Sequence, residues 1–169
     1  GNMTSGADGK TIDQMSIQRI EHIIESLKNE TYQPKPAKRV YIPKKNGGNR
    51  PLGIPSFEDK LVQEVARMIL EAIYEGHFES TSHGFRPYKS CHTALTQIQH
   101  QFTGTRWFIE GDIKGFFDNI NHNILIDTLR ERISDERFLR LVRKFLNAGY
   151  VDNWKYNRTY SGTPQGGII

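Results

Sequence analysis

The sequence predicts an α+β fold that is rich in helices and carries a few short antiparallel strands. Apolar residues recur at helical spacing in several separate segments. Two short runs flank an Asn-Gly-Gly tip at 46–48, which is typical of a β-hairpin. A second short hairpin is expected within residues 150–160.

The expected helices begin at residues that can accept hydrogen bonds from free backbone N–H groups. Ser16 predicts a helix that ends near Asn29. Ser56 with Asp59 fits a capping box, and the helix after it should reach about Tyr74. Ser90 predicts a helix to about Gln101, and two more are expected near 122–132 and 135–147.

Three strands are expected before residue 113. Those at 38–44 and 50–54 form the first hairpin, and Pro51 places the second of them at a sheet edge because proline cannot donate to a neighbour. The apolar run at 106–112 predicts a strand that ends at Asp112. A turn with Gly115 should follow, and then a helix capped by Asp118 or Asn119.

Composition limits the possible functions of the 169 residues, which suffice for one domain or two small lobes. Lys and Arg number 23 against 19 Asp and Glu, a mild excess that permits nucleic-acid binding without proving it. Cys91 is the only cysteine, so no internal disulfide or cysteine zinc cluster can form. A reducing, cytoplasmic compartment is expected, and no apolar run approaches the roughly 20 residues of a membrane span.

The two ends suggest a truncated chain. Residues 1–10 are rich in small residues and are expected to be mobile. The glycine-rich turn at 162–167 stops where an apolar run begins, and natural domains seldom end in this way. We therefore expect a piece of a longer protein.

Asp112 and Phe117 are the first candidates for chemistry. A carboxylate at a strand end can hold Mg²⁺, which prefers hard oxygen ligands and leaves room for substrate phosphates. The Phe117 ring, five residues later, could wall a sugar pocket and exclude a 2′-hydroxyl. The alternative is structural, since a lone carboxylate after a strand usually is. Phe116 is expected in the core.

Two basic segments could bind phosphates. Lys44, Lys45 and Arg50 surround the flexible hairpin tip, where lysine offers a compact charge and arginine a planar fork. Ordinary surface charge is the alternative. In the loop at 83–90, Arg86 and Lys89 flank a helix start that attracts anions. Phe85 and Tyr88 could stack on bases or sugars. The alternative is that Phe85 belongs to the core and that Pro87 and Ser90 only shape the loop and cap the helix.

A glycine-rich turn at 162–167 completes the candidate segments. Two glycines allow the backbone to approach a ligand closely, and Gln165 could hydrogen-bond a nucleotide or a template base. Such a turn by itself is weak evidence. The six histidines show no convincing metal-ligand spacing, so His122 and the others are assigned to the surface or the core.

In this order the segments resemble the reverse transcriptases encoded by bacterial group II introns, the intron maturases. The matching segments are Tyr-Ile-Pro-Lys-Lys-Asn-Gly-Gly-Asn-Arg-Pro-Leu-Gly-Ile-Pro at 41–55, Asp-Lys-Leu-Val-Gln at 59–63, His-Gly-Phe-Arg-Pro-Tyr-Lys-Ser at 83–90, Glu-Gly-Asp-Ile-Lys-Gly-Phe-Phe-Asp-Asn-Ile-Asn-His at 110–122 and Gly-Thr-Pro-Gln-Gly-Gly at 162–167. Residues 11–32 look like the family's N-terminal extension. Retron and diversity-generating reverse transcriptases share parts of this pattern.

The resemblance implies a right-hand polymerase with fingers and an incomplete palm. It divides the chain into a flexible segment at 1–10, an N-terminal extension helix at 11–35, the fingers at 36–104 and a partial palm at 105–169. It implies RNA-templated DNA synthesis with two Mg²⁺ ions, an intron RNA template, a DNA primer and deoxynucleoside triphosphates. It also implies help with splicing and mobility of the intron RNA.

The resemblance also assigns roles to single residues. Asp112 matches the first catalytic metal ligand, the Ile113 carbonyl matches a second-metal ligand, and Phe117 matches the sugar-selecting ring. The other residues matched to the incoming nucleotide are Lys44, Arg50, Lys114, Gly115, Phe116 and Gln165. The residues expected to contact nucleic acid are Lys45, Arg86, Lys89, Pro164 and Gly166. Asp112 should face the same cavity as the hairpin at 44–50.

The sequence departs from the family in one respect. The Tyr-Ala-Asp-Asp motif that supplies the other catalytic carboxylates is missing, and Asp112 cannot by itself hold two ions about 4 Å apart. The chain is therefore expected to be inactive alone, although its parent is a polymerase. An unfinished palm sheet would expose an edge and favour a homodimer.

Three other interpretations of the sequence remain open. The chain could be a noncatalytic RNA-binding module that clamps structured RNA through phosphate contacts. It could be another palm-like nucleotidyl transferase or cyclase, although the hairpin and the Gly-Thr-Pro-Gln-Gly-Gly segment argue against that. A purely structural interaction protein is the third reading.

Overall fold

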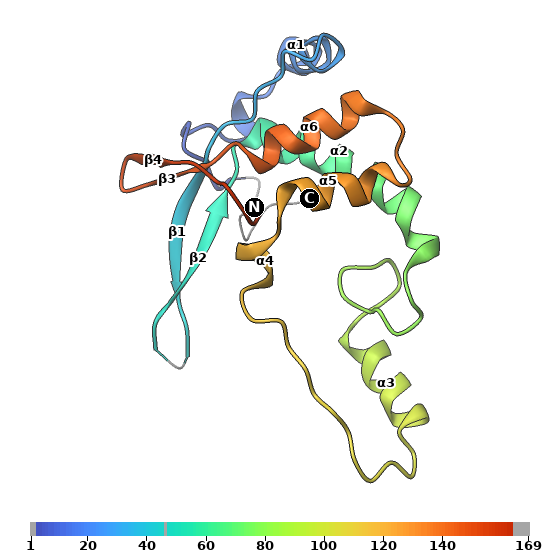
Figure 1. Cartoon of the computed structure of the whole chain (residues 1–169). Helices are drawn as coiled ribbons and strands as arrows, with labels where there is room; N and C mark the ends of the chain where they lie inside the picture. Colours follow the sequence, from blue (N-terminus) through green and yellow to red (C-terminus); the bar gives the residue numbers. More distant parts are fainter. Residues whose placement is uncertain (1–2, 46, 164–169) are drawn as a thin grey trace. The chain divides into compact units, whose positions relative to one another are not determined.

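A computed structural model of the chain (Figure 1) describes residues 3–45 and 47–163. These residues belong to two units. Unit 1 holds the residues up to Arg67 together with those from Gly115 onward. Unit 2 spans Met68–Lys114 and is inserted between the two halves of unit 1. The assignment of residues 36–104 and 105–169 to fingers and palm stays a prediction.

Unit 1 contains a four-stranded mixed sheet with the order β2-β1-β3-β4. The hairpin of β1 (Ala37–Pro43) and β2 (Asn49–Ile54) and the hairpin of β3 (Tyr150–Asp152) and β4 (Lys155–Asn157) are both antiparallel. The predicted hairpins and the edge position of β2 are confirmed. The parallel pairing of β1 with β3 was not expected, because it joins distant segments that no turn connects.

Unit 1 also contains helices. The elements are the 3₁₀ turn η1 (Ile12–Gln14), α1 (Ile17–Lys28), the first part of α2 (Phe57–Tyr74), α4 (Phe116–Asn119), α5 (His122–Arg130) and α6 (Glu136–Leu146). Ser16 caps α1 by accepting the N–H of Arg19 at 3.3 Å, and Asp135 caps α6. The predicted helices at 16–29, 122–132 and 135–147 are thus confirmed to within a few residues.

The core of unit 1 joins α1, α2 and α6. Ile23, Tyr32 and Val62 are buried together, and the Tyr32 ring lies 6.2 Å from the ring of Phe145 on α6. Leu139 of α6 is 1% exposed. Burying these apolar side chains is the main stabilising contribution to the unit. Figure 1 shows α5 and α6 as neighbouring helices joined by one short loop.

A buried carboxylate ties the segment after α1 to the start of α2. Asp59 is 2% exposed and accepts hydrogen bonds from the Tyr32 hydroxyl at 2.7 Å and from the Ser56 hydroxyl at 2.6 Å. The backbone N–H of Lys35 donates to the same carboxylate at 3.1 Å. Burial raises the pKa of Asp59, although these hydrogen bonds act in the opposite direction.

Unit 2 contains the last part of α2, the 3₁₀ turn η2 (Glu75–His77) and α3 (Cys91–Gln101). The Ser90 side chain caps α3 by accepting the N–H of Thr93 at 3.3 Å, as predicted. In residues 3–45 and 47–163 no helix is both long and apolar enough to cross a bilayer.

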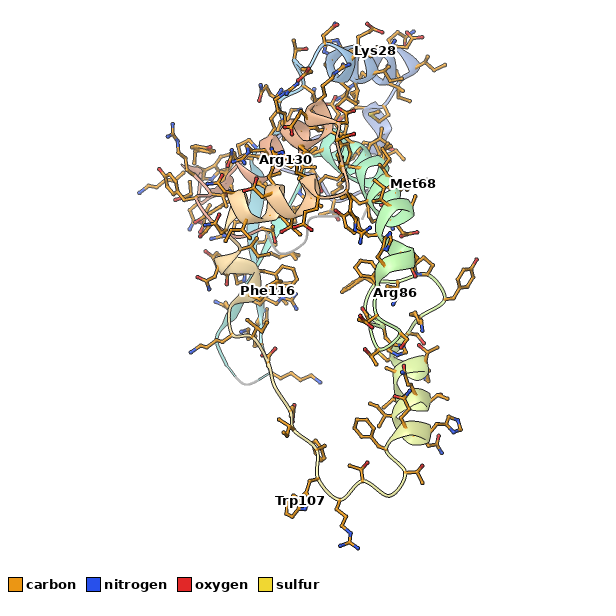
Figure 2. All side chains as sticks on the ribbon, turned by 45° about the vertical axis from the view of Figure 1, so that its right-hand side comes forward. Lys28, Met68, Arg86, Trp107, Phe116 and Arg130 are labelled. Atoms are coloured by element: carbon orange, nitrogen blue, oxygen red, sulfur yellow. The ribbon has the colours of Figure 1, made fainter. Side chains whose placement is uncertain are left out.

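The predicted strand at 106–112 is absent from the structure. Residues 105–113 carry no regular secondary structure, and every residue from Gln101 to Asn119 is exposed. Figure 2 shows Trp107 on an extended stretch of unit 2. A strand is held by hydrogen bonds to a neighbouring strand, and no described strand pairs with this stretch, so its apolar pattern produces no sheet.

The predicted cap at Asp118 or Asn119 is also wrong. Both residues lie inside α4, whose N-cap is Gly115. Asn121 caps the following helix α5 instead, because its side-chain oxygen accepts the N–H groups of Asn123 at 2.9 Å and Ile124 at 3.2 Å.

Candidate nucleotide and nucleic-acid site

The tip of the β1–β2 hairpin presents cationic side chains to solvent. The Lys44 N–H donates to the Gly48 carbonyl at 3.0 Å, and Gly47 and Gly48 both have positive φ. The side chains of Lys44, Lys45 and Arg50 are exposed. Lys44 and Lys45 form no ion pair with any residue that the structure describes. Their charges therefore remain available for an anionic ligand.

The turn before Phe117 is built on two local features. Gly115 has a φ of 65°, a left-handed conformation that glycine adopts without strain, and its carbonyl accepts the Asn119 side-chain amide at 2.8 Å. The rings of Phe116 and Phe117 meet edge to face with centroids 5.8 Å apart. Phe116, labelled in Figure 2, is 52% exposed, so its predicted core position is wrong.

The segment at 161–163 is hydrogen-bonded along the C-terminal side of α4, and we call this contact the α4 seam. The Gly162 N–H donates to the Ile120 carbonyl and the Thr163 N–H to the Phe117 carbonyl, both at 2.8 Å. The Ser161 hydroxyl donates to the Asp118 carbonyl at 3.2 Å. The seam therefore supplies partners for the carbonyl groups that a four-residue helix cannot satisfy by itself.

Glycine is required at the centre of the α4 seam. Gly162 has a φ of 77°, and a Cβ atom there would lie 2.5 Å from the Phe117 oxygen and 2.7 Å from the Asp118 oxygen. Any other residue would have to displace backbone. The two carbonyls it would strike belong to the turn that carries the candidate sugar-selecting ring.

His122 adds a side-chain hydrogen bond to the α4 seam. Its ring is 7% exposed, and Nε2 lies 2.7 Å from the Gly162 carbonyl oxygen. A carbonyl only accepts, so Nε2 carries the proton in this contact. Sequence reasoning assigned His122 to the surface or the core. The signal that could have revealed its partner is that residues 110–122 and 162–167 belong to the same recognised pattern.

A small cationic cavity opens beside the α4 seam. Its volume is about 280 Å³, and its lining includes Arg39 of β1, Asp118 and Arg158. The guanidinium carbon of Arg39 lies 3.4 Å from the centroid of the Tyr150 ring, a cation–π contact that orients the arginine. Neither arginine was among the predicted site residues. Both belong to unit 1, as does Phe117.

Asp112, the predicted metal ligand, is exposed in unit 2 together with Ile113 and Lys114. Within residues 3–45 and 47–163, no three His, Cys, Asp or Glu side chains come together to hold a metal ion. The donors of the described chain therefore do not fit a two-Mg²⁺ site by themselves. A shared cavity for Asp112 and the hairpin of unit 1 stays a prediction.

The loop at 78–90 in unit 2 is organised around Arg86. The guanidinium of Arg86 pairs with both carboxylate oxygens of Glu75 and donates to the carbonyls of Glu79 at 2.8 Å and Ser82 at 2.9 Å. Its side chain is only 10% exposed. Arg86 thus fixes the loop from inside, and its predicted contact with nucleic acid stays a prediction.

The same loop displays two aromatic side chains. Phe85 and Tyr88 are fully exposed, and both have positive φ, which is uncommon for large residues. Lys89, which follows them, is partly exposed. Pro164, Gln165 and Gly166, the remaining predicted contacts, lie outside the described residues.

The comparisons with known proteins agree with this set of features. A model of the reverse transcriptase (RNA-dependent DNA polymerase) family matches residues 42–169, so the chain belongs to the reverse transcriptase family. The group II intron-encoded protein LtrA of Lactococcus lactis subsp. cremoris is 56% identical over 170 residues, which cover 100% of this chain and 28% of LtrA. The resemblance to intron-encoded reverse transcriptases is confirmed.

Further relatives are also intron proteins. The putative COX1/OXI3 intron 1 protein of Saccharomyces cerevisiae is 42% identical over 100% of this chain and 20% of its own length. Nuclear intron maturase 1, mitochondrial, of Arabidopsis thaliana is 37% identical over 54% of this chain and 13% of its own length. The chain thus spans less than a third of each of these relatives.

Proposed function

We propose that this chain forms the fingers and part of the palm of a group II intron reverse transcriptase, which copies RNA into DNA. Membership of the reverse transcriptase family and the names of its relatives support this function. The observation that carries it is the α4 seam, because its hydrogen bonds join residues from two of the recognised segments, Gly162 and Thr163 from one and Ile120 and Phe117 from the other. These segments lie about 40 residues apart in the chain.

In this proposal, different groups of the chain contact the phosphates, the base pair and the sugar of the nucleotide. Lys44 and Arg50 bind the triphosphate, which suits exposed cationic side chains on a glycine tip. The backbone of residues 113–116 lies under the phosphates, and Gln165 contacts the newly formed base pair. The half-exposed ring of Phe117 lies against the sugar and excludes a 2′-hydroxyl.

The only ligands that we assign to Mg²⁺ within these residues are the Asp112 carboxylate and the Ile113 carbonyl. Two-metal catalysis needs further carboxylates. These 169 residues contain no Tyr-Ala-Asp-Asp motif to supply them. We therefore propose that the complete polymerase is active and that these 169 residues are not.

The proposed partners are an intron RNA template, a DNA primer and deoxynucleoside triphosphates, with the cytoplasm of a bacterium as the proposed location. The parent intron RNA is a further partner, since the relatives include an intron maturase by name. Self-association of the isolated chain stays a prediction, and light scattering over a range of concentrations tests it.

The decisive experiment is primer extension on an RNA template. The complete polymerase with Asp112→Ala should lose DNA synthesis and should bind RNA as the unchanged protein does. Asp127→Ala is a matched control, because Asp127 is an exposed carboxylate on α5 that the proposal leaves without a role. Synthesis by the Asp112→Ala protein, or robust Mg²⁺-dependent synthesis by the 169 residues alone, would refute the corresponding part of the proposal.

A second function, RNA binding without catalysis, is favoured by helix α6. Four cationic residues lie within eight positions of this helix: Arg137, Arg140, Arg143 and Lys144. Glu30 is the acidic partner of both Arg137 and Arg140. A positive surface of this kind binds phosphate backbones with an affinity that falls as salt rises. The 169-residue chain should then bind RNA in a salt-dependent way even though it makes no DNA.

A further inference from the structure

In the α4 seam, the buried His122 is hydrogen-bonded to the peptide group that also bonds the Phe117 backbone. His122 Nε2 donates to the Gly162 carbonyl at 2.7 Å, and the N–H of the next residue, Thr163, donates to the Phe117 carbonyl. The path from the His122 ring to the Phe117 backbone therefore contains two hydrogen bonds and one peptide unit. This path is polar and directional, unlike ordinary apolar packing.

The helix α4 depends on this support. It has only four residues, and a single helical turn is not stable by itself. The carbonyls of Phe117, Asp118 and Ile120 all find their donors in residues 161–163. A displacement of residues 161–163 thus displaces the turn that carries the Phe117 ring.

His122 is suited to hold that segment in place. It is the first residue of α5, and the helix is fixed by Ile126, which is 1% exposed. The imidazole thus stands on a rigid element. It donates its proton toward Gly162, which cannot bear a side chain without striking the Phe117 and Asp118 carbonyls.

We propose that His122 is a positioning residue for sugar selection, which acts by setting the distance between residues 161–163 and α4. The inference rests on the proposed function, in which Phe117 excludes the 2′-hydroxyl. His122 touches no substrate. It fixes the backbone behind the ring, so its loss lets Phe117 retreat and admits ribonucleotides.

The test uses the complete polymerase and measures kcat/KM for a deoxynucleoside triphosphate and for the matching ribonucleoside triphosphate. In His122→Phe the ring volume stays but the donor is lost, and the preference for the deoxy sugar should fall about tenfold. His122→Gln keeps an N–H donor and should restore the preference to within about threefold. A merely structural role would lower both rates equally.

Two comparisons separate the possible failures. Phe117→Ala should by itself lower the sugar preference, and if it does not, the proposed role of Phe117 is wrong. In the Phe117→Ala background, His122→Phe should change the preference no further. If Phe117→Ala lowers the preference but His122→Phe leaves it unchanged, the inference about His122 is overturned.

His122→Phe could also fail to fold, and His122→Gln and Gly162→Ala then carry the test. In Gly162→Ala the new Cβ would strike the Phe117 and Asp118 carbonyls. This substitution should therefore lower the sugar preference, as His122→Phe does. An unchanged sugar preference in a folded Gly162→Ala polymerase would also overturn the inference. So would a His122→Gln protein that discriminates as poorly as Phe117→Ala.

Discussion

The Tyr32 hydroxyl donates a 2.7 Å hydrogen bond to a carboxylate oxygen of Asp59, and both side chains are buried. This contact fastens the segment after α1 to the first turn of α2. Burial, together with the Asp59 charge, raises the pKa of Tyr32, so the hydroxyl keeps its proton and remains a donor. The Tyr32 side chain also belongs to the buried cluster that includes Ile23 and Val62.

Tyr32→Phe should destabilise the chain by about 1–2 kcal/mol, because it leaves a buried carboxylate oxygen of Asp59 without its donor. Urea unfolding followed by circular dichroism measures the change. Tyr41→Phe is the matched control, since the Tyr41 hydroxyl bonds Asp152 at an exposed site and its loss should have a much smaller effect on stability. Equal effects of the two substitutions would contradict this reading.

Glu58 makes the stability of the chain depend on pH. Burial by itself raises the pKa of Glu58, but hydrogen bonds from Arg19 and Lys35 outweigh it, and the pKa lies below the ordinary 4.5. A lowered folded pKa contributes stability that is present above pH 4.5 and is lost as pH falls through the folded value.

Glu58→Gln should therefore cost about 1 kcal/mol at pH 7, because Glu58 is largely shielded from solvent, and progressively less below pH 4.5. Urea unfolding at several pH values measures this difference. Glu21→Gln, at an exposed position of α1, should stay within about 0.5 kcal/mol of the unchanged chain throughout. A difference for Glu58→Gln that grows as pH falls would have the wrong sign.

Gly162→Ala should destabilise the described chain by about 2 kcal/mol, since its Cβ would strike the Phe117 and Asp118 carbonyls in a left-handed backbone conformation. Gly84→Ala is the control. Its Cβ would meet nothing within 4 Å, so its effect should be small. Both changes are measured by urea unfolding, and a neutral Gly162→Ala would show that the α4 seam is looser than described.

Arg86→Lys should loosen the loop at 78–90 in spite of the conserved charge. A lysine cannot reproduce the planar fork that binds Glu75 and two backbone carbonyls at once. Amide hydrogen exchange at Ser82 and Lys89 should become about tenfold faster. Lys89→Gln should leave these exchange rates unchanged, and so would Arg86→Lys if the arginine had no internal role.

Local signals predicted most of the elements, because caps and turn residues act within a few positions of the chain. Ser16, Ser90 and the Asn-Gly-Gly tip each gave the expected element. The run at 106–112 gave no strand, because strand formation depends on a neighbouring strand that a local pattern cannot supply. The cap of α5 was misplaced by two or three residues for a similar reason, since several Asx residues compete there.

The candidate site was predicted in part. The family and the exposed cationic tip followed from the sequence, whereas the contact of His122 with Gly162 is long-range and has no periodic signature. Arg86 was predicted as a nucleic-acid contact from its charge. Only the folded loop shows that Glu75 and backbone carbonyls occupy its donors.

The parallel pairing of β1 with β3 has a consequence for the order of assembly on the ribosome. The Tyr41 and Asp152 side chains that meet across it are 111 residues apart. Because synthesis adds about 5–20 residues per second, β3 emerges on the order of ten seconds after β1. Until then the hairpin is an isolated two-stranded ribbon of marginal stability, so its lysine-bearing tip gains its final support only late in synthesis.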